Sequence, residues 1–432
     1  MSEMITNDRA PERAALIGLI NRDRDEAEVE VSLCELERLL DTAGGEAVVK
    51  LTQAKETPDP ATYIGSGKLE ELCEVCKNNE ITLAVFDDEL SPSQIRNIEE
   101  GLEDVRVIDR TMLILDIFAA HAVTGEGKLQ VELAQLRYSI PRLMGKGTEL
   151  SRLGGGIGTS GPGESKLESD RRHLRRRMQA LREDLAEMEK NRETQRKARE
   201  RAGLKRVAIA GYTNAGKSTL LNKLTGAGIL AEDKLFATLD PTTRKYRLPC
   251  GIDILLTDTV GFIRRLPHHL VEAFRSTLDE VALADVIIVL IDASDPECAD
   301  QLEVTHKLLW DLGAQEKPTL YVYNKCDREC EVLPYIAARA DTVFISAKTG
   351  QGLDDLIRAL EDAATDGHTV ETFEFPMSEA RLLDRLYKNA VVSDVEYGDG
   401  VVRVRAIVDS QIKGALRQYI VKRGRADDEG QA

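Results

Sequence analysis

The sequence has no long hydrophobic run, few cysteines and no overall excess of positive charge. No apolar stretch among its 432 residues approaches the roughly 20 residues that are needed to span a bilayer. Residues 1–11 are polar and include Glu3 and Asp8, so we expect no secretory signal peptide. The seven cysteines are odd in number and lack framework spacing, which favours a reducing compartment. We therefore expect a cytoplasmic protein, while transient association with a membrane surface stays open.

The formal net charge of −17 argues at first sight against a nucleic-acid partner, because the nucleic-acid backbone is also negatively charged. The distribution of charge argues the other way. Residues 128–206 contain 20 Lys and Arg against 11 Asp and Glu. A basic segment in an acidic chain is typical of a local nucleic-acid contact. A solvated helix surface with mixed charges is the alternative.

Two short motifs near the N-terminus carry little chemical information. Cys73 and Cys76 form a C-x-x-C pair in a helix-like run, without the second ligand pair of a metal site. Gly65-Ser-Gly-Lys68 could hold a phosphate at a helix N-terminus, but a helix-entry turn is the favoured interpretation. We expect both motifs to be structural.

The stretch Gly211–Ser218 reads G-x-x-x-x-G-K-S and lies between an apolar run and a helix-like run. Strand, loop and helix in this order are the context of a P-loop, whereas a chance glycine-rich turn is the weaker alternative. Glycines let the backbone fold tightly, so that successive N–H groups point at phosphates beside a helix N-terminus. Lys217 can reach the β and γ phosphates, and Ser218 can ligate Mg²⁺.

Three further motifs follow, each just past a predicted strand, where ligands bind in an open α/β sheet. In Asp258-Thr-Val-Gly261, the aspartate would hold the magnesium shell through water and Gly261 would offer its N–H to the γ-phosphate. Asn324-Lys-Cys-Asp327 selects the base. Guanine presents two adjacent N–H donors that Asp327 can accept, whereas adenine would leave the carboxylate unpaired at a cost of about 1–3 kcal/mol.

The remaining parts of the predicted pocket surround the base. Asn324 supports the loop, the stem of Lys325 covers the base plane, and the backbone of Ser346-Ala-Lys348 closes the pocket near the guanine oxygen. We predict Lys217 and Gly261 as catalytic, and Ser218, Thr238 and Asp258 as the magnesium site. The predicted nucleotide contacts are Gly211, Tyr212, Thr213, Asn214, Ala215, Gly216, Lys217, Ser218, Thr219, Phe236, Thr238, Asp258, Thr259, Val260, Gly261, Asn324, Lys325, Asp327, Ser346, Ala347 and Lys348.

A long helix is predicted over residues 164–201. Its apolar residues follow an a/d seam, which predicts antiparallel pairing with the helical segment before it: Leu167, Leu174, Met178, Leu181, Leu185 and Met188. We expect that earlier segment to stop at Pro141. Residues 145–163 include eight glycines, and a functional loop is favoured over a linker. The arginine cluster at 171–177 suits phosphate backbones.

The fold class follows from the order of these segments. Strands and helices alternate over residues 1–111, which predicts a parallel sheet with crossover helices. We predict an α/β chain with an N-terminal α/β domain at 1–111, a helical hairpin with a glycine-rich, RNA-facing loop at 112–203, a P-loop GTPase domain at 204–367 and a small C-terminal α+β domain at 368–432. The tail should read helix, strand, turn, strand and helix, with residues 424–432 disordered.

The GTPase segment resembles the Obg–HflX superfamily, and four stretches resemble the HflX family itself: 109–118, 126–135, 161–168 and 236–244. The resemblance implies a GTPase that binds the large ribosomal subunit and its rRNA, with the hairpin near the peptidyl transferase centre. It implies splitting of stalled or idle ribosomes, notably under stress. It also implies an additional ATPase activity, placed in the N-terminal domain.

Five further residues concern the switch and the rate of hydrolysis. Thr238 aligns best with the threonine that senses the γ-phosphate, with Thr242 and Thr243 as alternatives. Phe262 stands where many small GTPases carry a water-orienting Gln, so we expect turnover near ~10⁻⁴ per second without the ribosome. Asn214 resembles the asparagine of potassium-stimulated GTPases, which implies stimulation by K⁺.

Two other functions stay open at this point. The chain could be a nucleotide-gated adaptor that binds a protein and uses hydrolysis as a timer, or an RNA-binding NTPase unrelated to ribosomes. In each case we expect a monomer. Phosphate contacts predict association that falls steeply with salt, which separates an RNA partner from a protein partner.

Overall fold

The computed structural model divides the chain into two compact units. One holds Met1–Lys197, Glu232–Asp240 and Ile263–Leu278, and the other holds Ala198–Ala231, Pro241–Phe262 and Asp279–Ala432. The residues that the structure describes are 11–145, 162–201, 204–226, 234–236, 239, 241–266, 270, 275–328, 342–365, 369–398, 400–408 and 410–421.

The N-terminal domain is a four-stranded parallel sheet in the order β2-β1-β3-β4. Its elements are β1 (Glu12–Ile20), α1 (Glu26–Thr42), β2 (Gly45–Ala54), α2 (Ser66–Asn78), β3 (Leu83–Phe86), α3 (Pro92–Leu102) and β4 (Arg106–Asp109). Six consecutive residues of β1 are buried, as expected for a strand covered on both faces. Capping boxes start α1 at Asp25 and α3 at Ser91. The predicted parallel sheet with crossover helices is confirmed.

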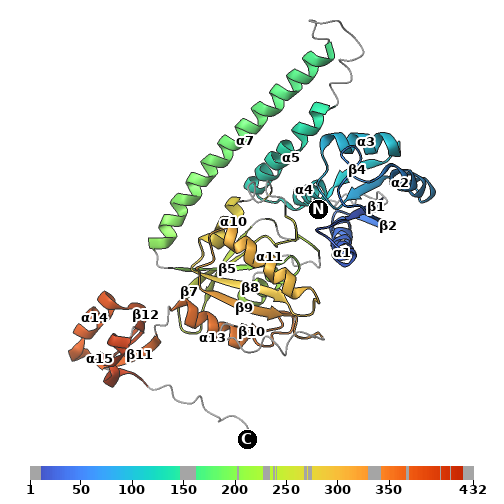
Figure 1. Ribbon diagram of the computed structural model, residues 1–432. Helices are drawn as coiled ribbons and strands as arrows, with labels where there is room; N and C mark the ends of the chain where they lie inside the picture. The colour runs from blue at the N-terminus through green and yellow to red at the C-terminus, as the bar shows by residue number, and fades with distance from the viewer. Residues whose placement is uncertain are drawn as a thin grey trace, which may run out of the picture. The chain divides into compact units, whose positions relative to one another are not determined.

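Three helices follow: α4 (Arg110–His121), α5 (Gly125–Gly145) and α7 (Pro162–Arg201), of which α7 enters the other unit at Ala198. Figure 1 shows α5 and α7 side by side as a hairpin. Ion pairs of 2.7 Å join Glu126 to Arg192 and Glu132 to Arg177. The pairing order is antiparallel, because the later residue on α5 meets the earlier residue on α7.

The predicted seam of α7 agrees with the burial of its side chains. Leu181 is fully buried, and four further seam residues are half-buried between exposed neighbours: Leu174, Met178, Leu185 and Met188. The predicted end at Pro141 is wrong, because α5 continues through this proline to Gly145. Proline removes one helical hydrogen bond but already has a helical φ, so it weakens a helix without always ending it. Of the glycine-rich stretch, residues 146–161 lie outside the described part, as do residues 424–432.

The second unit contains a six-stranded sheet in the order β10-β9-β8-β5-β7-β6. Five strands are parallel, and β6 is an antiparallel edge strand that the sequence had not indicated. Its elements are β5 (Lys205–Gly211), α8 (Lys217–Thr225), β6 (Thr242–Arg247), β7 (Asp253–Asp258), α10 (Arg275–Ala282), β8 (Val286–Asp292), α11 (Cys298–Asp311), β9 (Thr319–Asn324), β10 (Thr342–Phe344) and α13 (Leu353–Ala364).

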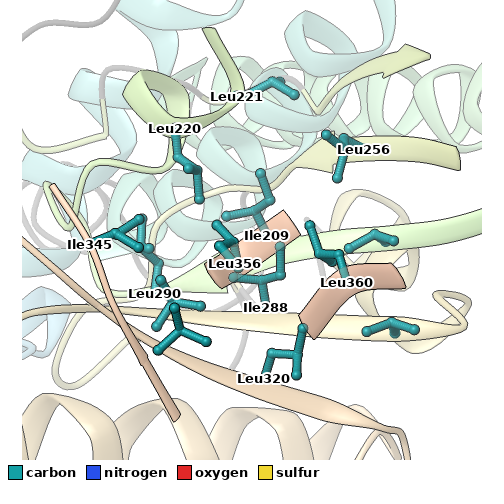
Figure 2. Close-up of a cluster of buried hydrophobic side chains, with 14 of the residues drawn as sticks. Ile209, Leu220, Leu221, Leu256, Ile288, Leu290, Leu320, Ile345, Leu356 and Leu360 are labelled. Atoms are coloured by element: carbon teal, nitrogen blue, oxygen red, sulfur yellow. The ribbon is translucent and has the colours of Figure 1, made fainter. Parts of the chain in front are cut away.

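One hydrophobic cluster holds this sheet against its helices. It joins strand residues to the apolar faces of α8 and α13 (Figure 2), and includes Ile209, Leu220, Leu221, Leu256, Ile288, Leu290, Leu320, Ile345, Leu356 and Leu360. Burial of this apolar surface fixes the strands, and with them the loops at their carboxyl ends.

The C-terminal part is an antiparallel sheet in the order β11-β13-β12 with short helices. Its elements are β11 (Thr369–Pro376), η1 (Met377–Glu379), α14 (Arg381–Asn389), β12 (Val391–Gly398), β13 (Val401–Val408), α15 (Ser410–Ala415) and η2 (Arg417–Tyr419). The predicted helix–strand–turn–strand–helix order is present, preceded by β11, which the sequence had not indicated. The predicted α/β fold class is confirmed. Among the described residues, no helix is long and apolar enough to cross a membrane.

Candidate nucleotide-binding site

The P-loop connects the end of β5 to the start of α8. Gly216 has a φ of 97°, and a Cβ at this position would lie 2.4 Å from the Asn324 Nδ2 atom, so only glycine fits. The buried Lys217 Nζ donates to the carbonyl oxygens of Gly211 at 3.2 Å and Tyr212 at 2.9 Å. Burial lowers the pKa of Lys217 to about 8. The lysine therefore lies folded onto the loop that would hold the phosphates.

The D-T-V-G segment is hydrogen-bonded to the P-loop. The Thr213 N–H donates to the Phe262 carbonyl at 2.8 Å, and the Phe262 N–H donates to the Gly211 carbonyl at 3.0 Å. A Cβ on Gly261 would lie 2.7 Å from the Thr213 Cα atom and 3.0 Å from the Lys217 Nζ atom. Glycine therefore brings this backbone against the lysine, where a γ-phosphate would lie.

Asp258 and Ser218 are two of the three residues predicted to hold Mg²⁺. The Ser218 Oγ donates to the Asp258 Oδ2 atom at 2.6 Å. Asp258 is fully buried, and its Oδ1 atom has no hydrogen-bond partner among the described residues. Burial raises the pKa of Asp258 more than Lys217 lowers it. An orphaned carboxylate oxygen beside a hydroxyl fits the hydrated shell of Mg²⁺.

A protein-only metal cage is absent from the described part of the chain. No group of three or more His, Cys, Asp or Glu side chains there could hold a metal ion, and Cys73 and Cys76 lie within α2. A magnesium ion at Asp258 and Ser218 would complete its coordination with phosphate oxygens and water, as Mg²⁺ commonly does. Thr238, the third predicted ligand, lies outside the described residues.

The N-K-x-D loop is joined to two other loops by one side chain. Asn324, which is 2% exposed, donates from Nδ2 to the Ala215 carbonyl at 2.8 Å and accepts from the Ala347 N–H at Oδ1 at 2.9 Å. The Ser346 Oγ donates to the Asp327 Oδ1 atom at 2.7 Å, which lowers the pKa of this exposed carboxyl group. The P-loop, N-K-x-D and S-A-K motifs thus meet at one edge of the sheet.

Sequence comparisons decide the family. A GTPase HflX of Caldanaerobacter subterraneus is 49% identical over 413 residues, covering 96% of this chain and 95% of the relative. GTPase HflX of Escherichia coli is 42% identical and covers 92% of this chain and 93% of the relative. The chain belongs to the HflX family of GTPases. This membership supports GTP hydrolysis and agrees with the four nucleotide-binding motifs.

Family profiles match successive parts of this HflX family member. They are described as GTP-binding GTPase N-terminal at residues 30–119, GTP-binding GTPase Middle Region at 121–199 and 50S ribosome-binding GTPase at 206–325. Among solved structures, the SsGBP and GDP complex is 26% identical with a TM-score of 0.47, covering 82% of this chain and 99% of that chain.

The remaining predicted nucleotide contacts of this HflX chain differ in burial, hydrogen bonding and backbone conformation. The Thr259 hydroxyl donates to the Ile209 carbonyl at 2.8 Å, Lys348 is exposed, and Asn214 has a φ of 62°. Val260 and Tyr212 are buried, and Thr219 is half-buried on α8. Phe262 is 1% exposed and forms part of the packed interior. An apolar ring there cannot orient an attacking water.

The candidate switch residues differ in their surroundings. Phe236 stacks edge-on against Phe118 with ring centroids 4.8 Å apart. Thr242 and Thr243 lie in β6, where Thr242 is paired with Asp258 and the Thr243 hydroxyl is 3.0 Å from that of Thr257. These two threonines are therefore part of a regular strand, which is not where a mobile switch threonine is expected.

Sequence reasoning missed two charged groups. Asp292, at the end of β8, forms a 2.7 Å ion pair with Lys325 of the N-K-x-D motif. In the other unit, Arg265 pairs with Asp87 at 3.2 Å and with Asp88 at 2.8 Å. Asp87 is fully buried. The available signal was an aspartate at the carboxyl end of a buried strand, as the last residue of β8 for Asp292 and directly after β3 for Asp87.

Proposed function

We propose that this HflX family member binds the large ribosomal subunit and uses GTP binding and hydrolysis to remodel or split ribosomes under stress. It acts as a cytoplasmic monomer. One observation carries the nucleotide part: Asn324 joins the P-loop, the N-K-x-D loop and the S-A-K loop by two hydrogen bonds. Three loops that are distant in sequence then form one pocket with separate places for phosphates and base.

The phosphate end of this pocket uses Lys217, the P-loop amides and the Gly261 N–H. Lys217 would exchange its two backbone carbonyl partners for β and γ phosphate oxygens, and the gain in charge pairing would offset its burial. Ser218 and Asp258, the latter through water, together with Thr238 would hold Mg²⁺, which neutralises charge that develops on the phosphates. Gly261 would donate its backbone N–H to the γ-phosphate.

The base end selects guanine through Asp327. The carboxylate accepts the two adjacent N–H groups of guanine, and the bond from Ser346 keeps it ionised and oriented. The motif therefore favours GTP over ATP as the main substrate.

The ribosomal part of the proposal rests on the surface of α7 and on family membership. Arg172, Arg175, Arg176 and Arg177 are exposed within two turns of this helix, and the profile over residues 206–325 is described as a 50S ribosome-binding GTPase. Closely spaced guanidinium groups on a rigid helix suit the phosphates of rRNA.

Co-sedimentation with purified large subunits tests this proposal. We expect the full chain to pellet with subunits in the presence of a non-hydrolysable GTP analogue and to remain in solution with GDP. Splitting of 70S particles by the GTP-bound chain should appear as subunit peaks in a sucrose gradient. Equal binding with both nucleotides would overturn the proposed switch.

A nucleotide-gated adaptor for a protein partner is the alternative function. The exposed arginines of α7 favour rRNA, because phosphate contacts release counterions and weaken with salt. Binding to subunits that changes little between 50 and 200 mM salt would favour the adaptor.

An ATPase activity would need a site outside the guanine-selecting loops. A cavity of about 550 Å³ lies at the carboxyl ends of β1 and β3, where ligands bind in parallel sheets. Its lining includes two arginines, Arg24 and Arg265, but also three carboxylates, and this excess of negative charge disfavours a triphosphate: Asp23, Asp88 and Glu89. ATP hydrolysis that survives Asp327→Asn and is lost in Arg24→Ala would place a second nucleotide there.

Stimulation by potassium is a further part of the proposal. Asn214 lies in the P-loop with a left-handed backbone, next to the expected phosphate position. We expect faster GTP hydrolysis in K⁺ than in Na⁺ at equal ionic strength, and Asn214→Ala should remove the difference. Equal rates in both salts would refute this part alone.

A further inference from the structure

The ion pair between Asp292 and Lys325 lies at the base-selecting end of the pocket. It joins the carboxyl ends of the neighbouring parallel strands β8 and β9, and the Asp292 Oδ2 to Lys325 Nζ distance is 2.7 Å. Both side chains are mostly buried, with 14% and 17% of their surface exposed. Asp292 belongs to none of the four nucleotide-binding motifs.

The carboxylate of Asp292 is held in one orientation. Its Oδ1 atom accepts the Ser294 N–H at 3.1 Å and the Ser294 hydroxyl at 2.7 Å, while Oδ2 faces Lys325. Each oxygen therefore has its own partner. The local turn fixes the carboxylate, so that it offers Lys325 a partner at a defined position.

The backbone of Lys325 is also fixed, in a conformation that residues with a side chain rarely adopt. Its φ is 64°, in the left-handed region. Three backbone hydrogen bonds surround it: Ala293 to Asn324, Cys326 to Ile345 and Arg328 to Lys325. Such a conformation persists only where the surroundings determine it, and it is common at ligand sites.

Lys325 is consequently held at both ends, at its backbone by the loop and at its ammonium group by Asp292. A free lysine side chain has many rotamers, and ordering it on ligand binding weakens affinity. A stem that is already stretched between two fixed points presents its methylene groups as a preformed apolar wall.

We propose that Asp292 is a positioning residue for guanine, which holds the stem of Lys325 in place to cover the base plane. This inference rests on the proposed function, because it concerns the same guanine site. It assigns to Asp292 a role separate from that of Asp327: Asp327 reads the edge of the base, whereas Asp292 acts through Lys325 on its face.

A double-mutant cycle with a fluorescent N-methylanthraniloyl GDP tests the proposal. The variants are Asp292→Ala, Lys325→Met and the pair together, because Met keeps an unbranched stem and removes the ammonium group. We expect each single change to raise the Kd for GDP roughly tenfold, and the double change to add nothing further. Asp311→Ala is the control. It removes an exposed carboxylate at the end of α11 and leaves the pair between Asp292 and Lys325 intact, so it should bind GDP within about twofold of the wild type.

Two further measurements separate positioning from a merely structural role. The affinity ratio between GDP and IDP, whose base lacks the exocyclic amine, should stay unchanged in Asp292→Ala, because the edge of the base is still read by Asp327. For hydrolysis, KM for GTP should rise while kcat at saturating GTP stays within about twofold. If Asp292→Ala folds poorly, Asp292→Asn carries the same two expectations, because it keeps an acceptor for Ser294 and removes the charge that holds Lys325.

Several results would overturn the proposal. The first is an unchanged Kd for GDP in Asp292→Ala. The second is a Kd in the double variant that equals the product of the two single increases. The third is a changed affinity ratio between GDP and IDP in Asp292→Ala. If the wild-type chain bound no guanine nucleotide, the proposed function itself would be overturned. That outcome is seen in the wild type, so it can be distinguished from any result with the variants.

Discussion

Asp87 is the centre of a buried charge cluster in the N-terminal domain. It lies directly after β3, is fully buried, and is paired with Arg24, Arg110 and Arg265. Burial raises its pKa, while the arginines, Arg24 foremost, oppose the rise. Three guanidinium groups around one carboxylate give a cluster in which every member depends on the central charge.

Replacing Asp87 with Asn should destabilise the protein by about 3–5 kcal/mol, because buried guanidinium groups lose their counter-charge. Asp88→Asn is the matched control. Its carboxylate is 30% exposed, so its loss should cost about 1 kcal/mol or less. Urea unfolding followed by circular dichroism measures both changes. Equal midpoints for the two variants would show that Asp87 is not the centre of the cluster.

Asp327 is the residue that we propose to select the base. Asp327→Asn should weaken GDP binding on the order of a hundredfold, since two N–H groups of guanine lose a charged acceptor. Xanthine, whose extra carbonyl suits an amide donor, should then bind better than guanine. Competition of GDP and XDP for a fluorescent nucleotide measures this, with the exposed Asp311→Asn as the control. An unchanged preference for guanine would contradict the pocket assignment.

Among the elements, the α5–α7 hairpin is the one that local sequence describes best. Its heptad seam reappears in the burial of Leu174, Met178 and Leu181. The two ion pairs between the helices, Glu126–Arg192 and Glu132–Arg177, could not be predicted from periodicity, because they depend on the register between the helices. The predicted end at Pro141 was wrong because the hydrogen bond that a proline removes does not by itself decide where a packed helix ends.

The exposed arginines of α7 give an element-scale prediction. Arg175→Glu with Arg176→Glu should reduce the salt dependence of subunit binding by about two in log–log slope, because each arginine is expected to neutralise about one phosphate. Arg182→Glu with Lys190→Glu makes the same charge change further along α7. Co-sedimentation at several salt concentrations measures the slopes. An equal reduction of the slope in both double variants would indicate that the substitutions act only through long-range electrostatic repulsion from the rRNA.

At the scale of the whole molecule, the two structural units do not follow the chain order. Two segments of the predicted GTPase domain belong to the unit that contains the N-terminal domain: Glu232–Asp240 and Ile263–Leu278. Phe236 on Phe118 and Arg265 on Asp87 are the contacts that place them there. The boundary between the two units therefore runs through the predicted GTPase domain at 204–367.

The buried Phe262 leads to a whole-molecule prediction. Because no glutamine follows Gly261, the purified chain should hydrolyse GTP near ~10⁻⁴ per second, and large subunits should accelerate it strongly. Single-turnover phosphate release with and without subunits measures this. As a control, Lys217→Ala should abolish both rates. Full turnover without ribosomes would show that the chain already contains every catalytic group.

The sequence by itself determined the elements and the nucleotide-binding motifs. Runs such as Val207–Ala210, and the spacing from Gly211 to Ser218, are local patterns whose geometry depends on near neighbours. The parallel N-terminal sheet and the heptad seam of α7 were predictable for the same reason. The edge strand β6 and the first strand β11 were not, because an edge strand has a weak apolar pattern and depends on its partner.

Only the tertiary structure decided which distant residues meet. Asp292 ends β8 and Lys325 follows β9, and they come within 2.7 Å only because these two strands pair in parallel register. Asp87 becomes the centre of a charge cluster because segments around residues 24, 110 and 265 converge on it. Ion pairs of this kind depend on register and burial across the whole fold, and neither property is encoded in any single stretch of the chain.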